Sequence, residues 1–429
     1  MTLNEFIKVI NGVSSIDSNE LIKEIKTDTR KINEGDIFIA LKGKNYNGED
    51  FINEAIKKGA IACVTHNSIN NKCIEVKDTI GSLFLLGNYI RNKYNIPLIA
   101  ITGSNGKTTT KDLLSYILSS KYNVLKNEGS KNNIIGVSDT LFNLNVTHEI
   151  IVMELGTNHL GEISYLSKLC NPNLGIITNI GSSHLKYFKK RINIFKEKIS
   201  IVDGMDNKKL IVNGDDKYLK KLNYFKCGLN KNNNLKAYNI KEYIDYIEFN
   251  IYLDKEYKII FNNPGIHFIN DILLAIKVAL DYKIDIETII DRINNFKLTN
   301  KRMNIIKLKN NILINDCYNA SLESVIGGIN YLKKIESKKV LIIGDILELG
   351  KHSKRIHKKI NKEVSKLKNK KVLTVGRYSK YIKGINFNDV DELIEYIKIN
   401  KINNSYIYVK GSRRMNLDKF IDFIEKRAI

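Results

Sequence analysis

Tryptophan is absent from this chain of 429 residues, and proline occurs only three times. With so few prolines, domain boundaries must be inferred from changes in the hydrophobic pattern rather than from breaker residues. No apolar run approaches the roughly 18 residues that a membrane-spanning helix needs. The N-terminal stretch MTLNEFIKVI also lacks the basic leader and the apolar core of a signal peptide. We therefore expect a cytoplasmic protein that does not insert into a membrane.

Cysteine is scarce, and its spacing fits neither a disulfide framework nor a zinc site. The five cysteines are Cys63, Cys73, Cys170, Cys227 and Cys317. Their number is odd, no C-x-x-C pair occurs, and no histidine pair lies near them in the sequence. We expect reduced thiols that are mostly buried.

Acidic residues are few relative to basic ones, 46 against 69, which gives a formal net charge of +23. Such a charge taken alone favours nucleic acid or an anionic membrane as a partner. The lysines, however, are spread along the whole chain among isoleucine and asparagine, whereas nucleic-acid binders more often concentrate them on one element. The charge would also help to attract small polyanions such as ATP, so it selects no single partner.

The length predicts roughly three domains of about 100 to 200 residues each. Residues 1–96 combine short apolar runs with helical patterns, which predicts a small α/β domain. Across residues 97–299, strand-like runs alternate with helix-like stretches, the pattern of a mostly parallel sheet covered on both faces. Within that range, residues 236–261 alternate apolar and polar positions, which predicts antiparallel strands. Residues 300–429 predict a second alternating α/β unit, a C-terminal Rossmann-like domain.

A glycine-rich segment directly follows the apolar run of residues 96–102 and opens an amphipathic helical stretch. Its sequence, GSNGKTTT over residues 103–110, has the composition of a loop that grips phosphates between a strand and a helix. Lys107 would supply a positive charge, and the Thr108 hydroxyl would reach a magnesium ion. The full pattern G-x-x-x-x-G-K-[ST] would place glycine where this chain has Ile101. The flanking strand and helix nevertheless favour a nucleotide triphosphate site over a chance match.

Three polar residues, Glu154, His184 and Asp345, stand just after apolar runs. Ligands of open parallel sheets gather beyond the carboxyl ends of the strands, so these positions are candidates for a site. Glu154 suits a ligand of the loop magnesium, although it could instead cap the next helix. His184 taken alone could equally be a hydrogen-bonded structural group. Lys198 taken alone would be an ordinary solvated lysine on a helix.

Seven segments together resemble the Mur ligase family, and the resemblance covers nearly the whole chain. They are TDTR at 27–30, GDIFIALKG at 35–43, GSNGKTTTK at 103–111, ELGTNHLGEI at 154–163, DCYNAS at 316–321, GDILELG at 344–350 and KGSR at 410–413. The last three are similar to the branch of the family that adds a D-alanyl-D-alanine dipeptide. The chain departs from the family pattern at Ser200, Phe268, Cys317 and Ser321, and none of these changes removes a proposed ligand.

The resemblance implies an ATP-dependent ligase that joins D-alanyl-D-alanine to UDP-N-acetylmuramoyl-tripeptide through an acyl phosphate, in peptidoglycan precursor synthesis. It implies ATP and two Mg²⁺ ions as cofactors. It assigns the sugar nucleotide to residues 1–96 and ATP to the P-loop domain at 97–299. Residues 300–429 would bind the incoming dipeptide and close onto ATP. We expect a monomer that binds no nucleic acid.

The resemblance also assigns roles to individual residues. Catalytic roles fall to Lys107, Glu154, His184 and Lys198, and Lys198 would be carbamylated so that it can help His184 to bind a second magnesium ion. The metal ligands would be Thr108, Glu154, His184 and Lys198. The groups that contact ATP would be Gly103, Ser104, Asn105, Gly106, Lys107, Thr108, Thr109, Asn270, Arg302 and Asp316. The sugar nucleotide and the dipeptide would contact Thr27, Asp28, Thr29, Arg30, Lys42, Asn319, Lys410 and Arg413.

Three other functions fit parts of the sequence. A sister ligase that adds a single amino acid, or a folylpolyglutamate synthase, would share the phosphate loop and differ in its amine substrate. A basic P-loop ATPase that acts on nucleic acid would account for the charge of +23. A non-catalytic sugar-nucleotide sensor would keep the fold, but the intact set of loop, carboxylate, histidine and lysine argues against it.

Overall fold

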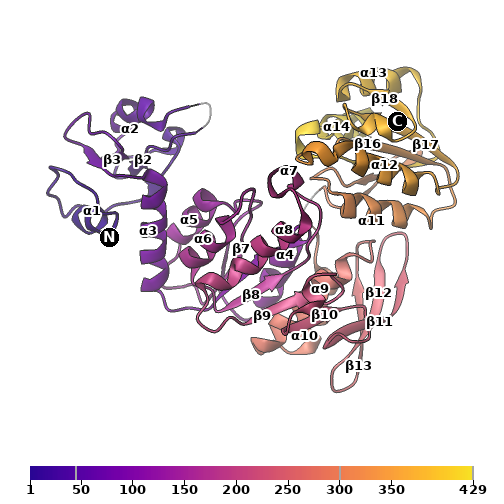
Figure 1. Cartoon of the computed structure of the whole chain (residues 1–429), viewed down its shortest axis with the longest axis horizontal. Helices are drawn as coiled ribbons and strands as arrows, with labels where there is room; N and C mark the ends of the chain where they lie inside the picture. The colour runs from indigo at the N-terminus through magenta and orange to yellow at the C-terminus, as the bar shows by residue number, and fades with distance from the viewer. Residues whose placement is uncertain (44–45, 299–300, 428–429) are drawn as a thin grey trace.

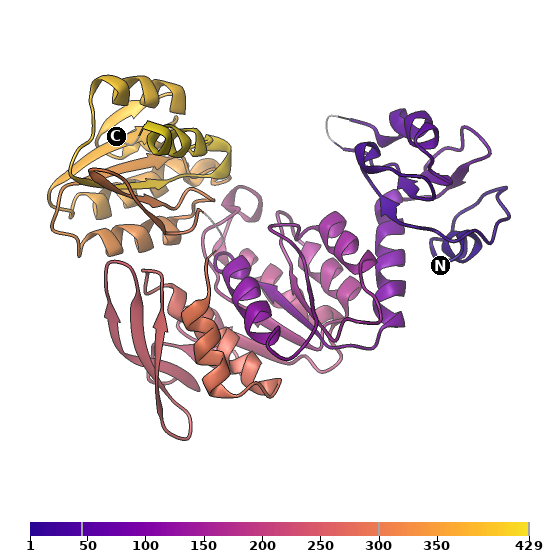
Figure 2. The same cartoon turned by 180° about the vertical axis from the view of Figure 1, so that it is seen from behind.

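The computed structural model describes residues 1–43, 46–298 and 301–427. They form three domains in a row, and Figures 1 and 2 show the N-terminal and C-terminal domains at opposite ends of the central one. The predicted division between the central and C-terminal domains, at residues 299 and 300, falls outside the described residues. In the described part of the chain, no helix is both long enough and apolar enough to span a membrane.

The N-terminal domain is built on a four-stranded parallel sheet in the order β1-β2-β3-β4. The strands are β1 (Ile25–Lys26), β2 (Ile37–Ile39), β3 (Ala62–Thr65) and β4 (Cys73–Glu75). The helices are α1 (Leu3–Val9), α2 (Ile52–Lys57) and α3 (Thr79–Lys93). Helix α3 leaves this domain and packs against the central one, where Arg91 donates a hydrogen bond from Nε to the Cys170 carbonyl at 2.8 Å.

The central domain is organised around a nine-stranded sheet in the order β13-β12-β11-β10-β9-β8-β5-β7-β6. Its strands are β5 (Leu98–Thr102), β6 (Val124–Lys126), β7 (Ile150–Glu154), β8 (Leu174–Ile177), β9 (Leu210–Asn213), β10 (Phe225–Gly228), β11 (Leu235–Glu242), β12 (Ile247–Tyr252) and β13 (Glu256–Phe261). The pairs from β6 through β11 are parallel, whereas β11, β12 and β13 pair antiparallel. The predicted antiparallel strands within residues 236–261 are therefore confirmed, and they extend the edge of the parallel sheet.

Helices cover the central sheet on both faces, as the alternating pattern predicted (Figure 1). They are α4 (Lys107–Leu118), α5 (Ile134–Phe142), α6 (Glu162–Cys170), α7 (Leu185–Phe188), α8 (Arg191–Ile199), α9 (Phe268–Asp281) and α10 (Ile286–Asn295). The central strand β5 is buried along its whole length, so its residues are all apolar up to its last position, Thr102. This burial fixes the point at which the phosphate loop leaves the sheet.

The C-terminal domain contains a six-stranded sheet in the order β14-β15-β19-β16-β17-β18, with only β14 antiparallel to its neighbour. The strands are β14 (Asn304–Lys307), β15 (Asn311–Asn315), β16 (Lys339–Gly344), β17 (Lys370–Val375), β18 (Ile385–Phe387) and β19 (Ser405–Lys410). The helices are α11 (Leu322–Leu332), α12 (Ser353–Val364), α13 (Val390–Ile399) and α14 (Asp418–Arg427). This arrangement confirms the predicted Rossmann-like unit.

The apolar cores show how the domains are joined. The core of the central sheet continues into residues of α11 and α12, so the central and C-terminal domains share one hydrophobic cluster. The N-terminal domain instead has two smaller clusters of its own. All five cysteines are free thiols and buried, as predicted. Burial raises the pKa of the thiols of Cys63 and Cys170 to about 12.

Candidate functional site

The phosphate loop has the backbone geometry that its glycines were expected to allow. Strand β5 ends at Thr102, and the chain then passes through Gly103 at φ 150° and Gly106 at φ 82° before α4 begins at Lys107. A Cβ atom at Gly103 would lie 1.9 Å from Oγ1 of Thr178, and one at Gly106 would lie 2.3 Å from Oδ1 of Asp271. Both positions therefore require glycine, and the loop presents its backbone at the start of a helix, where anions bind.

Lys107 is folded back over this loop. Its Nζ donates a hydrogen bond to the Gly103 carbonyl at 3.0 Å, and the residue is partly buried. Burial lowers the pKa of Lys107, while the charge of Glu154 opposes that shift. The ammonium group therefore lies in a partly desolvated position, where its attraction to a phosphate would be stronger than in bulk water.

Glu154, the last residue of β7, is buried and forms a carboxylate centre beside the loop. Thr108 donates a hydrogen bond from its hydroxyl to Oε2 at 2.7 Å, and Asn132 donates from Nδ2 to Oε1 at 2.6 Å. Hydroxyl and carboxylate oxygens held side by side are the donors that Mg²⁺ prefers. These residues thus fit a divalent cation at the loop, and no helix-capping hydrogen bond of Glu154 is found among the described residues.

The loop that follows β6 supports this carboxylate, although sequence reasoning assigned it no role. Asn127 contacts the Glu154 backbone twice, accepting from its N–H at 2.8 Å and donating to its carbonyl at 2.9 Å. Lys111, which is fully buried, donates to the carbonyls of Asn127 and Gly129 at 2.5 and 3.1 Å. Lys111 therefore fixes the loop that carries Asn132.

Lys198 on α8 is not the ordinary solvated lysine that its sequence context allowed, because it is 2% exposed. Among the described residues we find no hydrogen-bond or ion-pair partner for its Nζ. Burial lowers the pKa of Lys198 well below its ordinary value, and the nearby charge of Lys107 lowers it further. More of the amine is therefore neutral at neutral pH, which is the form that reacts with carbon dioxide. Lys198 lies outside the residues that line the cavity described below.

Glu197, beside Lys198 in the sequence, was not predicted and has a structural role. Its carboxylate accepts hydrogen bonds from the N–H groups of Gly161 and Ile163 at 2.7 and 2.8 Å and from the Thr157 hydroxyl at 3.1 Å. It thereby caps the start of α6 and holds the segment that follows Glu154. Its signal in the sequence was only its adjacency to Lys198.

His184 stands at the start of α7 with φ 57°, in the left-handed region. Its Nδ1 lies 2.5 Å from Oε2 of Glu348, a residue of the C-terminal domain. The proximity of His184 lowers the pKa of Glu348. Within the described ranges, no group of three or more His, Cys, Asp and Glu side chains could hold a metal ion by itself. A second metal would thus depend on His184 together with a modified lysine.

On α9, a residue that lines the cavity is the neighbour of Asn270, whose contact with the nucleotide stays a prediction. Asn270 does not line the cavity, and its Oδ1 is buried with no hydrogen-bond partner among the described residues. Asp271, the next residue, does line it, beside Gly106. Burial raises the pKa of Asp271 to about 8, against the lowering effects of Thr110 and Arg302. The structure thus places a carboxyl group that is largely neutral at pH 7 next to the phosphate loop.

The C-terminal domain supplies a second polar wall. At the end of β15, Asp316 accepts hydrogen bonds from Lys410 Nζ at 2.6 Å and from the Tyr408 hydroxyl at 3.0 Å. The guanidinium groups of Arg302 and Arg413 lie 4.2 and 5.7 Å from the centre of the Tyr318 ring. Asp345 lies apart from this wall, because it accepts from the N–H groups of Tyr378 and Ser379 at 2.9 and 2.6 Å. Its role is to hold the turn after β17.

Several contacts join the C-terminal domain to the central domain, among them three between side chains near this wall. Ser321 donates a hydrogen bond to Oδ1 of Asn105 in the phosphate loop at 2.8 Å, and Ser182 donates to Oε2 of Glu323 at 2.9 Å. The contact of His184 with Glu348 is the third. The C-terminal domain is therefore seated against the phosphate loop in this structure.

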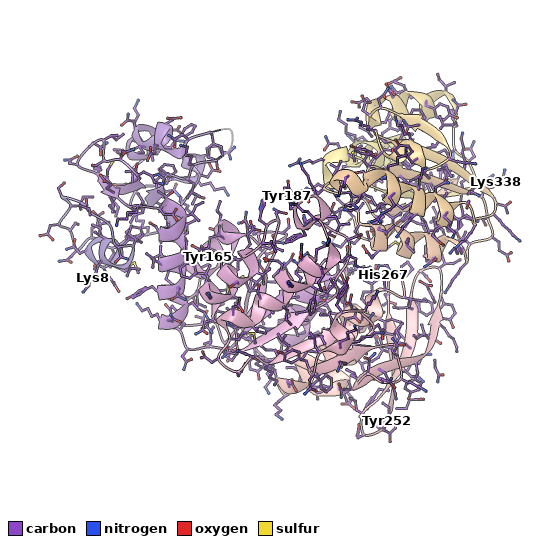
Figure 3. All side chains as sticks on the ribbon, viewed as in Figure 1. Lys8, Tyr165, Tyr187, Tyr252, His267 and Lys338 are labelled. Carbon is purple, nitrogen blue, oxygen red and sulfur yellow. The ribbon has the colours of Figure 1, made fainter. Side chains whose placement is uncertain are left out.

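A cavity of about 1150 Å³ lies between the two walls. Figure 3 shows His267, which lines it, where the central and C-terminal domains meet. The predicted site residues that line it are Ser104, Asn105, Gly106, Lys107, Thr108, Thr109, Glu154, His184, Arg302, Asp316, Asn319, Lys410 and Arg413. The structure thus brings together the predicted phosphate, metal and C-terminal groups, which lie far apart in the sequence.

The predicted sugar-nucleotide residues lie elsewhere, in the N-terminal domain, where Thr29 is buried. Asp28 forms an ion pair with Arg30 at 2.8 Å, and the Arg30 side chain is 85% exposed. The hydrogen bond from Arg30 lowers the pKa of Asp28 to about 2. Thr27, Thr29 and Lys42 do not line the cavity either, to which this domain contributes only Ile80 among the described residues. Their assignment stays a prediction.

Three family models match consecutive parts of the chain. The model described as Mur ligase family, catalytic domain, matches residues 21–118, the Mur ligase middle domain matches residues 101–279, and the Mur ligase, glutamate ligase domain, matches residues 301–413. Two curated relatives are both named UDP-N-acetylmuramoyl-tripeptide–D-alanyl-D-alanine ligase. That of Buchnera aphidicola subsp. Baizongia pistaciae is 35% identical over 94% of this chain and 93% of its own, and that of Bacillus subtilis is 30% identical over 99% and 98%.

Solved structures show the same arrangement of domains. MurF from Acinetobacter baumannii superposes with a TM-score of 0.91 at 27% identity, covering 99% of this chain and 98% of that one. The MurF ligase of Thermotoga maritima, determined in complex with ADP, superposes with a TM-score of 0.86 over 95% and 98%. Its identity of 24% supports the fold alone.

Proposed function

Because this chain belongs to the Mur ligase family, we propose that it joins D-alanyl-D-alanine to UDP-N-acetylmuramoyl-tripeptide and releases ADP and phosphate from ATP. The observation that carries the proposal is the single cavity in which the phosphate loop and Glu154 face Asp316, Lys410 and Arg413. A reaction between an activated carboxylate and a second substrate requires a nucleotide site and a separate polar wall that face each other across one cavity. The product would serve cytoplasmic peptidoglycan precursor synthesis.

The main chemical obstacle to this reaction is that a free carboxylate is unreactive towards an amine. An amine does not displace oxide from a carboxylate at a useful rate, so the tripeptide carboxylate first attacks the γ-phosphate of ATP, which gives an acyl phosphate and ADP. The amine of the dipeptide then adds to the acyl carbon, and phosphate leaves. Lys107 and the loop N–H groups would stabilise the negative charge that develops during phosphoryl transfer.

The donor set around Glu154 fits Mg²⁺, which when bound would neutralise phosphate charge and orient the γ-phosphate. Thr108 and Glu154 would hold the first ion, because their oxygens are already adjacent. His184 and Lys198 would hold a second ion once Lys198 carries a carbamate. The burial of the Lys198 amine, which lowers its pKa well below the ordinary value, supports this modification.

The C-terminal wall would bind the dipeptide. Lys410 and Arg413 can pair with its carboxylate, and Asn319 offers an amide to its backbone. Arg302 and Asp316 would contact ATP from the same wall. The C-terminal domain would open to admit substrates and return to the seated position to exclude water that would hydrolyse the acyl phosphate.

In the N-terminal domain, the hydroxyls, carboxylate and guanidinium of Thr27, Asp28, Thr29 and Arg30, with Lys42, would bind the uridine diphosphate. The Arg30 side chain is exposed and available for this role. The protein would act in the cytoplasm, and it would act as a monomer because each chain carries both walls of the cavity and the N-terminal residues proposed for the sugar nucleotide.

The test is phosphate release from ATP by the purified protein with UDP-N-acetylmuramoyl-tripeptide and a panel of amines. We expect release to require D-alanyl-D-alanine and to be low with single amino acids. Release with a single amino acid, or with glutamate and a folate, would instead identify a sister ligase or a folylpolyglutamate synthase. Release stimulated by nucleic acid without any dipeptide would overturn the proposal.

A further inference from the structure

Positive charge is distributed unevenly between the domains. Residues 300–429 contain 29 Lys and Arg against 13 Asp and Glu, whereas residues 1–96 contain 13 against 12. Lysine occurs along the whole chain, but the acidic residues that would balance it are scarce in the C-terminal part. Most of the net charge therefore lies at the end of the molecule that the C-terminal domain forms (Figure 1).

Helix α12 is the most basic element of this domain. Its buried side, with Ile356, Ile360 and Val364, packs into the hydrophobic core, and its other side faces solvent. The exposed basic residues at its start and along that side are Lys351, Lys354, Arg355, Lys358, Lys359 and Lys362. Residues 349–362 contain no Asp or Glu, and within the described ranges none of these six side chains forms an ion pair.

Basic residues on two neighbouring segments extend this surface. The turn after β17 lies beside α12, because the Lys383 N–H donates a hydrogen bond to Oδ1 of Asn361 at 2.8 Å. At the start of α12, Nε2 of His352 lies 3.2 Å from the Lys189 carbonyl, just after α7 of the central domain. The six residues named above, together with the exposed Lys186, Lys189, Lys190, Lys380 and Lys383, are called the basic face below.

We propose that the basic face docks on an anionic phospholipid bilayer. Lysines without ion-pair partners repel one another, and a surface of negative headgroups relieves that repulsion. Each lysine or arginine held near such a surface strengthens binding about fivefold, and salt screens the effect. The apolar side of α12 is already buried in its own domain, so the contact would be electrostatic and would need no insertion into the bilayer.

The tyrosines beside α12 favour a bilayer over a nucleic acid. Single-stranded nucleic acids bind by stacking their bases on open aromatic faces. Here Lys354 Nζ lies 5.4 Å from the centre of the Tyr381 ring, and the Arg377 guanidinium lies 5.6 Å from that of Tyr378. His357 also stacks on Tyr378 at 6.1 Å. Both rings are half-buried and already contacted by the protein's own side chains, so they offer no platform for a base.

The remaining side chains of the basic face agree with this choice. Tyr187, which Figure 3 shows near the boundary of the central and C-terminal domains, contacts Lys186 Nζ at 5.6 Å and the His159 ring at 4.8 Å. Arg355 is the face's single arginine, whereas recognition of nucleic acids relies more on arginine, whose planar group binds phosphates and bases in a fork. A field of lysines instead suits the diffuse charge of lipid headgroups.

The first experiment is flotation of the purified protein with vesicles of phosphatidylcholine that contain about 30% phosphatidylglycerol, in about 50 mM salt. We expect the protein to float with these vesicles but not with pure phosphatidylcholine, and about 0.5 M salt should release it. Failure to bind the anionic vesicles would overturn the proposal. No nucleotide, peptide or dipeptide is present, so the outcome is independent of the proposed ligase reaction.

The second experiment asks whether α12 makes the contact. The combined substitutions Lys354→Gln, Lys358→Gln and Lys362→Gln remove three charges from its exposed side. We expect the affinity for the anionic vesicles to fall on the order of 100-fold. Thermal unfolding should show that the variant folds like the wild type, because the three side chains are exposed.

The matched control removes the same number of charges from the N-terminal domain, by Lys8→Gln, Lys57→Gln and Lys72→Gln. These lysines are exposed, and Figure 3 shows Lys8 at the opposite end of the molecule from Lys338 of the C-terminal domain. We expect the control to lose less than about threefold in vesicle affinity. Equal losses in the two variants would show that the whole net charge attracts the vesicles, and would overturn a docking role for the basic face.

Competition with single-stranded RNA separates the bilayer from the other class of polyanion. Poly(U) is added to the vesicle-bound protein at about one tenth of the concentration of lipid phosphate. We expect the protein to stay on the vesicles. Transfer of the protein to the RNA at this ratio, prevented by the α12 substitutions, would identify a nucleic-acid surface and overturn the proposal.

Discussion

The two walls of the cavity are built in different ways. On the central wall, the contacts that shape the site join neighbouring elements of one domain, as between Thr108 on α4 and Glu154 on β7 at 2.7 Å. On the other side, contacts such as that of Asn105 with Ser321 at 2.8 Å cross a domain boundary. The phosphate wall is therefore prearranged by the fold, whereas the second wall exists as part of the site only for one position of the C-terminal domain.

The largest effect on turnover should come from removing the positive charge of Lys107 in the phosphate wall. For Lys107→Ala we expect turnover to fall by about 10³-fold, the scale for loss of a preorganised group that stabilises the transition state. The fold should remain intact, because the substitution removes a desolvated cation and only one backbone contact. Phosphate release and thermal unfolding measure the two effects. Turnover close to that of the wild type would place the nucleotide elsewhere.

The next prediction concerns Lys198, the buried lysine of α8. Lys198→Met should abolish turnover and raise the free energy of unfolding at pH 7 by about 1–3 kcal/mol, because it removes a buried polar group without a partner among the described residues. Burial lowers the pKa of Lys198 in the folded state, so the unfolded chain binds the extra proton. The wild-type protein therefore gains stability as the pH rises towards the ordinary lysine pKa, and the advantage of the variant shrinks.

Urea unfolding between pH 7 and pH 10, in buffer free of carbon dioxide, checks this prediction. Lys196→Met, on the same helix, is the control for loss of a lysine. An advantage of Lys198→Met that grows with pH would contradict the depressed pKa.

A smaller effect is expected at Asp271, where the prearranged wall carries an acid. Burial raises the pKa of Asp271 to about 8 in the folded state, against 3.8 ordinarily. Between these values the folded chain binds the proton that the unfolded chain has lost, so wild-type stability should fall as the pH rises from 4 to 8. Asp271→Asn removes this dependence. Its stability relative to the wild type should be greater at pH 8 than at pH 5 by about 1–3 kcal/mol, and denaturant titrations at both values would measure it.

The smallest effect should come from weakening the boundary between the central and C-terminal domains. Ser321→Ala removes one hydrogen bond between the walls, and net contributions of such bonds are about 0.5–1.5 kcal/mol. We expect the KM for the dipeptide to rise about two- to tenfold, with little change in the affinity for ATP in the absence of the dipeptide. Equilibrium binding of an ATP analogue and steady-state kinetics separate the two. A larger loss of ATP affinity than of dipeptide affinity would mean that the walls are not independent.

The sequence contained enough local information to predict the phosphate wall. A buried strand, two glycines at constrained positions and the start of a helix are set by short-range chemistry, and the alternation within residues 236–261 similarly predicted the antiparallel strands. The expected nucleotide contact at Asn270 lies beside Asp271, the residue that lines the cavity. One step along a helix turns a side chain by about 100°, so a helical pattern does not say which of two adjacent residues lines a cavity.

Other parts of the site depend on distances in space that no local pattern records. Asn132 contacts Glu154 from a loop 22 residues earlier, and Glu197 caps a helix more than 30 residues away. The contact between His184 and Glu348 requires the relative placement of two domains. Composition could not place such contacts, because each depends on how separate elements pack together.

The buried thiols have a practical consequence for testing the proposed motion of the C-terminal domain. Alkylating reagents attack the thiolate, and all five native cysteines are buried, with burial raising the pKa of Cys63 and Cys170 to about 12. A dye-reactive cysteine introduced on each of the two outer domains would thus be labelled selectively in the native protein. Because the native cysteines would not be labelled, fluorescence energy transfer between the two dyes can measure opening and closing of the C-terminal domain during single turnovers.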